Sequence, residues 1–212
     1  MSLQVITVPL TAGKEPSGLI VTLHGWGANA QNLASIVPLL NFPDYQFMFP
    51  NAPFDHPHVF GGKMWYDLSS EKGQGLPESR KLLTDWLQSL ESSTGVPLSR
   101  TILAGFSQGG AMTLDVGLGL PLVGLVALSG YLHPISEPPG SQFPPVLIVH
   151  GRQDSVVPLK AALQARESLM ALGVSVQYQE FDMGHEIRPE VLPVIYNFVL
   201  RVMPKESQKI IK

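Results

Sequence analysis

The feature that most constrains this chain is a serine between two glycines, placed where an apolar run gives way to helix-forming residues. Residues 101–104 are β-branched or apolar, Gly105-Phe106-Ser107-Gln108-Gly109 follows, and a helical pattern begins at once. A sharp strand-to-helix turn leaves no room for side chains two positions either side of the serine. Ser107 would then project into a cleft as a nucleophile. The backbone N–H of Gln108, at the positive end of the helix, would be free to hold an oxyanion.

A serine nucleophile needs a general base, and the base needs an acid to orient it. Residues 146–151 are typical of a buried strand followed by Asp154, and residues 175–181 alternate as a strand followed by His185. Because functional groups gather at the carboxyl ends of parallel strands, we expect these side chains to meet Ser107. The order Ser107, Asp154, His185 is that of α/β hydrolases.

The acid has alternatives. Asp154 lies shortly before a helix expected to begin near Pro158, so its role could be that of a cap. Asp182 and Glu180 are the reserve candidates for the acid. We favour Asp154 because it follows the strand end directly.

The histidines need the same comparison. His185 follows a late strand and precedes the last helix, where this fold needs its base, although an ordinary surface position is the alternative. His150 ends a buried strand and is expected to bond backbone groups. His133, next to a proline, is expected on the surface. The histidines of segment 56–58 have no nearby carboxylate or cysteine cluster, so we predict no metal site.

A second oxyanion donor is expected from an earlier strand. Residues 19–23 form an apolar β-type run that ends in His24-Gly25-Trp26-Gly27. The glycines would let this loop pack beneath the nucleophile, so that the Trp26 N–H becomes the second donor and His24 braces the loop. An ordinary glycine turn is the alternative.

Residues 51–76 lack clear periodicity and exceed an ordinary connection, which favours a functional loop or a small lid. Trp65 and Tyr66 lie in this excursion. We predict that they contact substrate, with anchoring of the loop to the body as an equal alternative.

Strand and helix patterns alternate along the chain, which predicts an α/β fold with a mostly parallel sheet covered on both faces. We expect one domain over residues 1–212 and a frayed tail over 205–212. The expected strands lie near Val5 and at 19–23, 46–49, 101–104, 123–128, 146–149 and 174–181, and the expected helices at 29–39, 77–90, 108–117, 158–172 and 189–202.

Several segments together resemble the phospholipase/carboxylesterase family, which includes the acyl-protein thioesterases. They are His24-Gly25-Trp26-Gly27, Pro50-Asn51-Ala52-Pro53, Trp65-Tyr66-Asp67, Gly105-Phe106-Ser107-Gln108-Gly109-Gly110, Gly151-Arg152-Gln153-Asp154 and Gly184-His185. The resemblance implies an α/β-hydrolase fold that needs no cofactor, with Ser107, Asp154 and His185 as triad and Trp26 and Gln108 as oxyanion donors. Members that act on acylated proteins commonly carry Gly-Leu-Gly-Asp where this chain has Gly-Trp-Gly-Ala.

Charge and composition restrict the partners. The net charge of −3 gives no basic surface for a nucleic acid. No apolar stretch approaches the ~20 residues that span a bilayer, and the first residues do not resemble a signal peptide, so we expect a cytoplasmic protein without stable membrane insertion. The chain has no cysteine, which excludes a cysteine nucleophile.

The sequence therefore predicts a serine carboxylic-ester hydrolase for small-molecule esters or thioesters with an apolar acyl group, lipids and acylated proteins included. A ligand-binding relative without turnover is the alternative from another class. Peptidase or acyltransferase activity would use the same triad, and the oligomeric state stays open.

Overall fold

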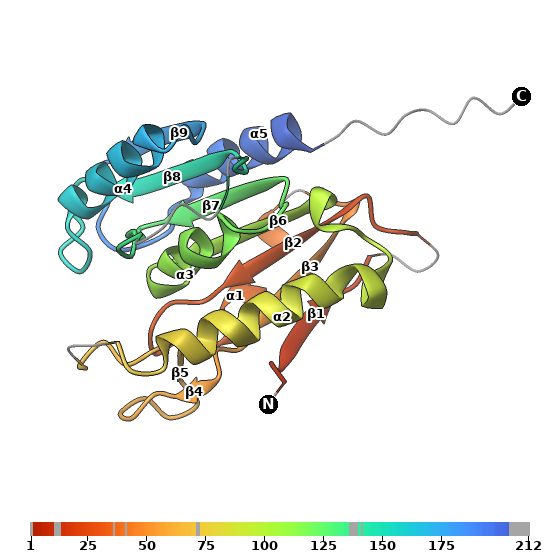
Figure 1. The fold of residues 1–212 in the computed structure, drawn as a ribbon, viewed down its shortest axis with the longest axis horizontal. Coiled ribbons are helices and arrows are strands. Elements are labelled where there is room, and N and C mark those ends of the chain that lie inside the picture. Colours follow the sequence, from red (N-terminus) through yellow and green to blue (C-terminus); the bar gives the residue numbers. More distant parts are fainter. Residues whose placement is uncertain are drawn as a thin grey trace, which may run out of the picture.

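The computed structural model describes residues 2–10, 14–35, 37–40, 42–70, 73–135, 140 and 142–203. Within them, seven strands form one sheet in the order β1-β3-β2-β6-β7-β8-β9 (Figure 1). β1 is antiparallel to β3, and every other neighbouring pair is parallel. The strands are β1 (Val5–Val8), β2 (Gly18–Leu23), β3 (Tyr45–Pro50), β6 (Thr101–Phe106), β7 (Gly124–Leu128), β8 (Val146–Gly151) and β9 (Val176–Phe181). All seven predicted strands are confirmed.

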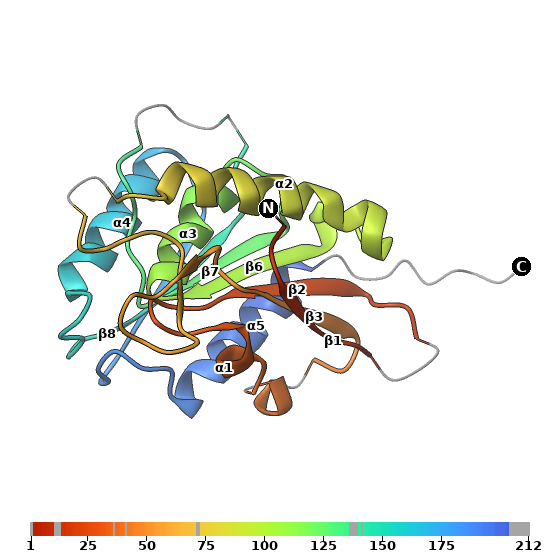
Figure 2. The same ribbon diagram turned by 90° about the horizontal axis from the view of Figure 1, so that it is seen from below.

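Helices cover both faces of the sheet. In Figure 2, α2, α3 and α4 lie on one face, and α1 and α5 lie on the other. Alternate residues of β2 point to the two layers: Leu19 and Val21 pack in the core beneath α2 to α4, whereas Ile20 packs toward α1 and α5. The predicted mostly parallel, doubly covered sheet is thus confirmed. The helices are α1 (Ala30–Ala34), α2 (Leu76–Thr94), α3 (Gln108–Gly117), α4 (Leu159–Ala171) and α5 (Leu192–Val202), with 3₁₀ turns at Val37–Leu39, Leu98–Arg100 and Pro189–Val191.

The helix predicted over 29–39 is wrong as a single element. α1 begins after Asn29, whose side chain accepts the Asn32 N–H in a capping box, but it ends at Ala34. The 3₁₀ turn Val37–Leu39 contains a proline, which has no N–H with which to continue a helix. Residue 36 lies outside the described residues. The helix predicted over 189–202 likewise begins with a 3₁₀ turn before α5.

The excursion predicted over 51–76 contains a small ribbon that sequence periodicity could not reveal. β4 (Phe54–Asp55) pairs antiparallel with β5 (Lys63–Met64), and strands of two residues are too short for an alternating pattern. Movement of this excursion as a lid stays a prediction, as does the single-domain division. The tail predicted to fray, residues 205–212, lies outside the described residues.

None of the helices in the described part of the chain combines the length and the apolar character needed to cross a bilayer.

Candidate active site

The predicted strand-to-helix turn is present, and its backbone is strained. Ser107 follows β6 directly and precedes α3, and it has φ 56° and ψ −119°, a region that residues other than glycine rarely adopt. A β-carbon at Gly105 would collide with the backbone of Gly109, and one at Gly109 would collide with the carbonyl of Leu23 at the end of β2. Both glycines are therefore required by close backbone packing, and this packing holds the serine at the carboxyl edge of the sheet.

Three predicted side chains, brought from loops after three different strands, form one hydrogen-bonded chain. His185 Nε2 lies 2.9 Å from Ser107 Oγ, and His185 Nδ1 lies 2.8 Å from Asp154 Oδ2. Donation from Nδ1–H to the carboxylate leaves Nε2 as the acceptor for the serine hydroxyl, which is the arrangement a general base needs.

Asp154 is held ionised. Asp154 is buried, and its Oδ1 accepts the backbone N–H groups of Val156 and Val157 at 2.9 and 2.8 Å. Burial alone would raise the pKa of Asp154, but the hydrogen bonds from His185 and from these two N–H groups outweigh burial and hold the pKa below its usual range. The same contacts also order the turn before α4. Asp154 therefore fills the structural role that was its alternative, and the same side chain also lies where it can orient His185.

The competing acids pair elsewhere, whereas His150 lies against the same carboxylate, with its Nε2 at 3.5 Å from Asp154 Oδ2. Glu180 and Asp182, the reserve acids, pair with Arg152 at 2.9 and 2.7 Å. His150 is fully buried, with Nε2 at 2.8 Å from the carbonyl of Val157, which is the predicted backbone contact.

The loop after β2 packs against Ser107 as predicted. A β-carbon on Gly25 would lie 3.3 Å from the Ser107 β-carbon. Gln108 opens α3, so its backbone N–H has no acceptor within the helix, and the Trp26 N–H donates to none of the described residues. Neither of these two N–H groups has an acceptor among the described residues.

His24 braces this loop in its neutral form. Its Nε2 accepts the Ala52 N–H at 3.0 Å, and its Nδ1 lies 2.8 Å from the Gly25 carbonyl. Burial lowers the pKa of His24 to about 4, although the bond to Gly25 opposes this shift. A neutral imidazole has one donor and one acceptor, and both are used here.

The predicted substrate contacts of Trp65 and Tyr66 are contradicted by their burial. Trp65 is 0% exposed and Tyr66 is 4% exposed, so neither offers a surface to a ligand. The Trp65 indole N–H donates to the His24 carbonyl at 3.0 Å, and its backbone N–H donates to Gln108 Oε1 at 2.9 Å. Gln108 Nε2 donates to the Tyr66 carbonyl at 2.7 Å. These aromatics therefore anchor the excursion to the body, which was the alternative interpretation.

A partly buried polar network beside these aromatics was not predicted. Arg80 donates from its guanidinium to Asp115, and His133 Nδ1 lies 3.2 Å from the same carboxylate. His133 Nε2 lies 2.9 Å from the Tyr66 hydroxyl, which also contacts the hydroxyl of Tyr131. The predicted surface position of His133 is wrong, since its side chain is only 10% exposed. Asp115 is the one charged residue of α3, and this was the available signal, because buried carboxylates need partners.

The His56 side chain serves the backbone of its own segment. His56 Nδ1 accepts the N–H groups of His58 and Val59 at 3.1 and 3.0 Å, and the His56 ring meets that of Trp26 at a centroid distance of 4.1 Å. The described residues contain no group of three or more His, Cys, Asp or Glu placed to hold a metal ion.

The sheet order together with a hydrogen-bonded serine, histidine and aspartate at an elbow define an α/β-hydrolase-fold protein. A family model described as phospholipase/carboxylesterase matches residues 7–203, and the chain belongs to this family.

Individual relatives agree. Acyl-protein thioesterase 1 of Neurospora crassa is 30% identical over 90% of this chain and 89% of its own length. Acyl-protein thioesterase 1 homolog 2 of Dictyostelium discoideum is 30% identical over 89% of this chain and 90% of its own length. The crystal structure of esterase PE8 superposes with a TM-score of 0.85 at 31% identity, covering 96% of this chain and 100% of that one. The chain is accordingly a hydrolase of the serine-esterase type.

Proposed function

We propose that this hydrolase cleaves carboxylic esters or thioesters through an acyl-enzyme formed on Ser107. The observation that carries the proposal is the unbroken hydrogen-bonded chain from Ser107 through His185 to Asp154. The Ser107 oxygen attacks the acyl carbonyl while His185 Nε2 takes its proton. The imidazolium then gives this proton to the departing alcohol or thiol, and Asp154 stabilises the charge on the ring.

Water completes the cycle by the same route. His185 takes a proton from water as the water oxygen attacks the acyl carbon, and the proton returns to Ser107 when the free acid leaves. In both steps the carbonyl oxygen becomes an oxyanion between the Trp26 and Gln108 N–H groups. One such donor is worth about 3 to 4 kcal/mol in the transition state of comparable enzymes.

The substrate proposed is an ester or thioester with an apolar acyl group. Trp26 is 40% exposed beside the proposed oxyanion site, and Val156 is 65% exposed two residues after Asp154. Val59, also exposed, comes close to the loop after β2 at Gly27. Apolar side chains around a reactive serine favour uncharged substrates. The names of the relatives make acylated proteins candidates, and lipid esters share the same chemistry.

The alternative of a ligand-binding protein without turnover has no observation in its favour, because nucleophile, base and acid are all in contact. Acceptors other than water, as in acyltransferases, would use the same acyl-enzyme. A cytoplasmic location stays a prediction from the sequence.

The decisive experiment compares wild type with Ser107→Ala in the release of p-nitrophenol from p-nitrophenyl butyrate, together with labelling by a fluorophosphonate. We expect turnover and labelling in wild type and neither in the variant. A folded wild type that neither turns over nor labels would refute the proposal, and persistent turnover in the variant would remove Ser107 from its role.

A further inference from the structure

His150, at the carboxyl end of β8, is a buried histidine to which the proposed reaction gives no role. Its side chain is 0% exposed, as is that of Asp154 four residues later. His150 Nε2 lies 2.8 Å from the Val157 carbonyl and 3.5 Å from Asp154 Oδ2. His185 Nδ1 lies 2.8 Å from the same Oδ2. One oxygen of the proposed acid is therefore close to two imidazoles.

The Val157 carbonyl fixes the tautomer of His150. A carbonyl oxygen only accepts hydrogen bonds, so His150 Nε2 must carry a proton and donate it to Val157. The same N–H lies near the Asp154 carboxylate. At 3.5 Å this second interaction is an electrostatic contact, and burial of both side chains reduces its screening by water.

Val157 connects His150 to the other oxygen of the carboxylate. The Val157 N–H donates to Asp154 Oδ1 at 2.8 Å, beside the Val156 N–H at 2.9 Å. Val157 therefore donates to Asp154 through its N–H and accepts from His150 through its carbonyl. His150 thus acts on both oxygens of Asp154, on Oδ2 directly and on Oδ1 through the backbone of Val157.

Backbone contacts set the distance between the loop of the acid and the loop of the base. The Gln153 N–H donates to the Met183 carbonyl at 3.1 Å. A β-carbon at Gly151 would collide with the same carbonyl. These contacts fix the two loops against each other, but they do not reach the carboxylate. The direction of the Asp154 side chain depends instead on the groups that surround its oxygens, and His150 is one of them.

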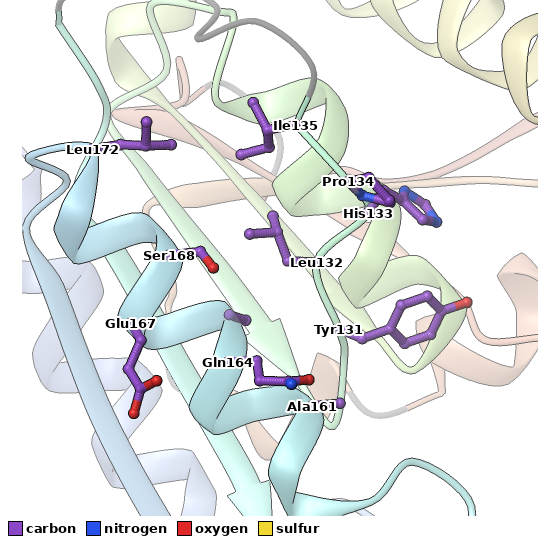
Figure 3. A pocket seen from close by; sticks show the side chains of 11 residues that line it. Tyr131, Leu132, His133, Pro134, Ile135, Ala161, Gln164, Glu167, Ser168 and Leu172 are labelled. Atoms are coloured by element: carbon purple, nitrogen blue, oxygen red, sulfur yellow. The ribbon is translucent and has the colours of Figure 1, made fainter.

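The helix after the acid loop does not replace His150 in this task. α4 begins at Leu159, and Ala161 in its first turn borders a hollow of about 530 Å³ between α4 and the segment 131–135 (Figure 3). None of the described residues that line this hollow donates to Asp154. The side of α4 that faces the hollow therefore leaves the carboxylate to the donors from β8, the turn and His185.

The second ring nitrogen shows that a histidine at this position has a cost. His150 Nδ1 is buried and has no hydrogen-bond partner in the part of the chain that the structure describes. An unpartnered buried polar atom opposes folding, and an apolar side chain would avoid this penalty. The net gain from one neutral hydrogen bond to a backbone carbonyl is small. The contact with Asp154 gives the imidazole a role beyond that bond.

We propose that His150 is a positioning residue for the proposed reaction, whose Nε2–H holds the Asp154 carboxylate in the direction that orients His185. This inference rests on the proposed function. Positive charge develops on His185 as Ser107 attacks, and Asp154 must then stay in line with Nδ1 of His185. Because its side chain is 0% exposed, His150 touches no substrate and acts only through Asp154 and Val157.

Three variants test the inference on p-nitrophenyl butyrate. His150→Leu removes the donor, whereas His150→Gln keeps an N–H donor at about the reach of Nε2. Thr101→Val is the matched control, because the Thr101 hydroxyl is also buried and also donates to a backbone carbonyl, that of Pro97 at 3.1 Å. Thr101 begins β6, at the end of the strand away from Ser107. Urea unfolding verifies that each variant folds and compares the losses of stability.

His150→Leu should lower kcat by roughly 10- to 100-fold, the range for outer hydrogen-bond partners of metal-bound histidines. Complete loss of the acid's function sets the upper limit at ~10⁴. KM should stay within about twofold of wild type, since substrate binding is unchanged. His150→Gln should recover most of the lost kcat. Thr101→Val should keep the wild-type kcat although its urea midpoint falls.

Three kinetic results would overturn the inference. The first is a folded His150→Leu with kcat within about twofold of wild type. The second is an equal loss of kcat in Thr101→Val, because the loss would then follow stability. The third is a His150→Gln variant as impaired as His150→Leu, because the N–H donor would then have no effect of its own.

A measurement on wild type decides the matter if His150→Leu does not fold. Nitrogen-15 spectra of protein labelled at histidine should show the proton of His150 on Nε2, with the signal assigned by its absence from His150→Gln. A proton on Nδ1 would overturn the inference, because Nε2 could then donate neither to Val157 nor toward Asp154. The tautomer is observed without turnover. A wild type that is inactive on every ester would instead refute the proposed function, whichever tautomer His150 shows.

Discussion

Acid should destabilise this protein through His24. The imidazole is fully buried, and its folded-state pKa of about 4 lies below the ordinary value of 6.5. Between these two values the unfolded chain binds a proton that the folded chain does not, so stability rises with pH across this window. The contribution of the neutral His24 imidazole to the free energy of unfolding is complete above about pH 6.5 and is lost as the pH falls toward 4. The full difference corresponds to about 3 kcal/mol at 1.36 kcal/mol per pKa unit.

His24→Gln removes this titration while keeping an acceptor for the Ala52 N–H. Between pH 7 and pH 5, the free energy of unfolding in urea should fall by about 2 kcal/mol more for wild type than for the variant. Most of the pH window lies in that interval. Carboxylates with lowered pKa values, such as Asp115, titrate alike in both proteins, so their effects on stability cancel in the comparison. His58→Gln, at an exposed histidine, serves as control and should keep the wild-type pH dependence. If His24→Gln lost as much stability as wild type, the assignment of a neutral, buried His24 would be refuted.

Three further variants test the site. Asp154→Asn should lower kcat by as much as ~10⁴ through the wrong histidine tautomer, measured on p-nitrophenyl butyrate; activity near wild type would move the acid to Asp182 or Glu180. Gln108→Leu leaves the Trp65 N–H and the Tyr66 carbonyl without their partner. The free energy of unfolding, measured in urea, should therefore fall by roughly 1 to 3 kcal/mol for each unsatisfied group. An unchanged midpoint would contradict the role of this side chain. Gly109→Ala should abolish fluorophosphonate labelling, because the new methyl group meets the carbonyl of Leu23; normal labelling would show that the elbow tolerates a side chain there.

The strands and the reactive side chains were predictable because their signals are local. An apolar run, a glycine-flanked serine and two strand-loop boundaries can each be recognised within a few residues. Parallel strands then place Ser107, Asp154 and His185 at one edge, so the topology supplies the long-range contact that the local signals lack. This is why three side chains distant in sequence were identified, and why their hydrogen bonds follow from the fold.

The partly buried network was not predictable in the same way. Its contacts join Tyr66 to His133 and Arg80 to Asp115, pairs separated by 67 and 35 positions. No motif sets these spacings, and a histidine next to a proline is typical of an exposed connection. The partners become apparent only when α2, α3 and the segment after β7 are packed together, because burial of Asp115 then demands counter-charge and hydrogen bonds.

Trp65 and Tyr66 were predicted to contact the substrate, but they anchor the excursion to the body instead. Their observed contacts limit how the excursion can move. Of the two proposed oxyanion donors, Trp26 lies on the loop after β2 and Gln108 opens α3 after β6. Preorganised donors must be fixed before the substrate reacts. Trp65 connects them, since its indole N–H donates to the His24 carbonyl in the loop and its backbone N–H donates to the side chain of Gln108. Opening the excursion at Trp65 would break both bonds. Any lid movement compatible with an intact oxyanion site must therefore leave Trp65 in place.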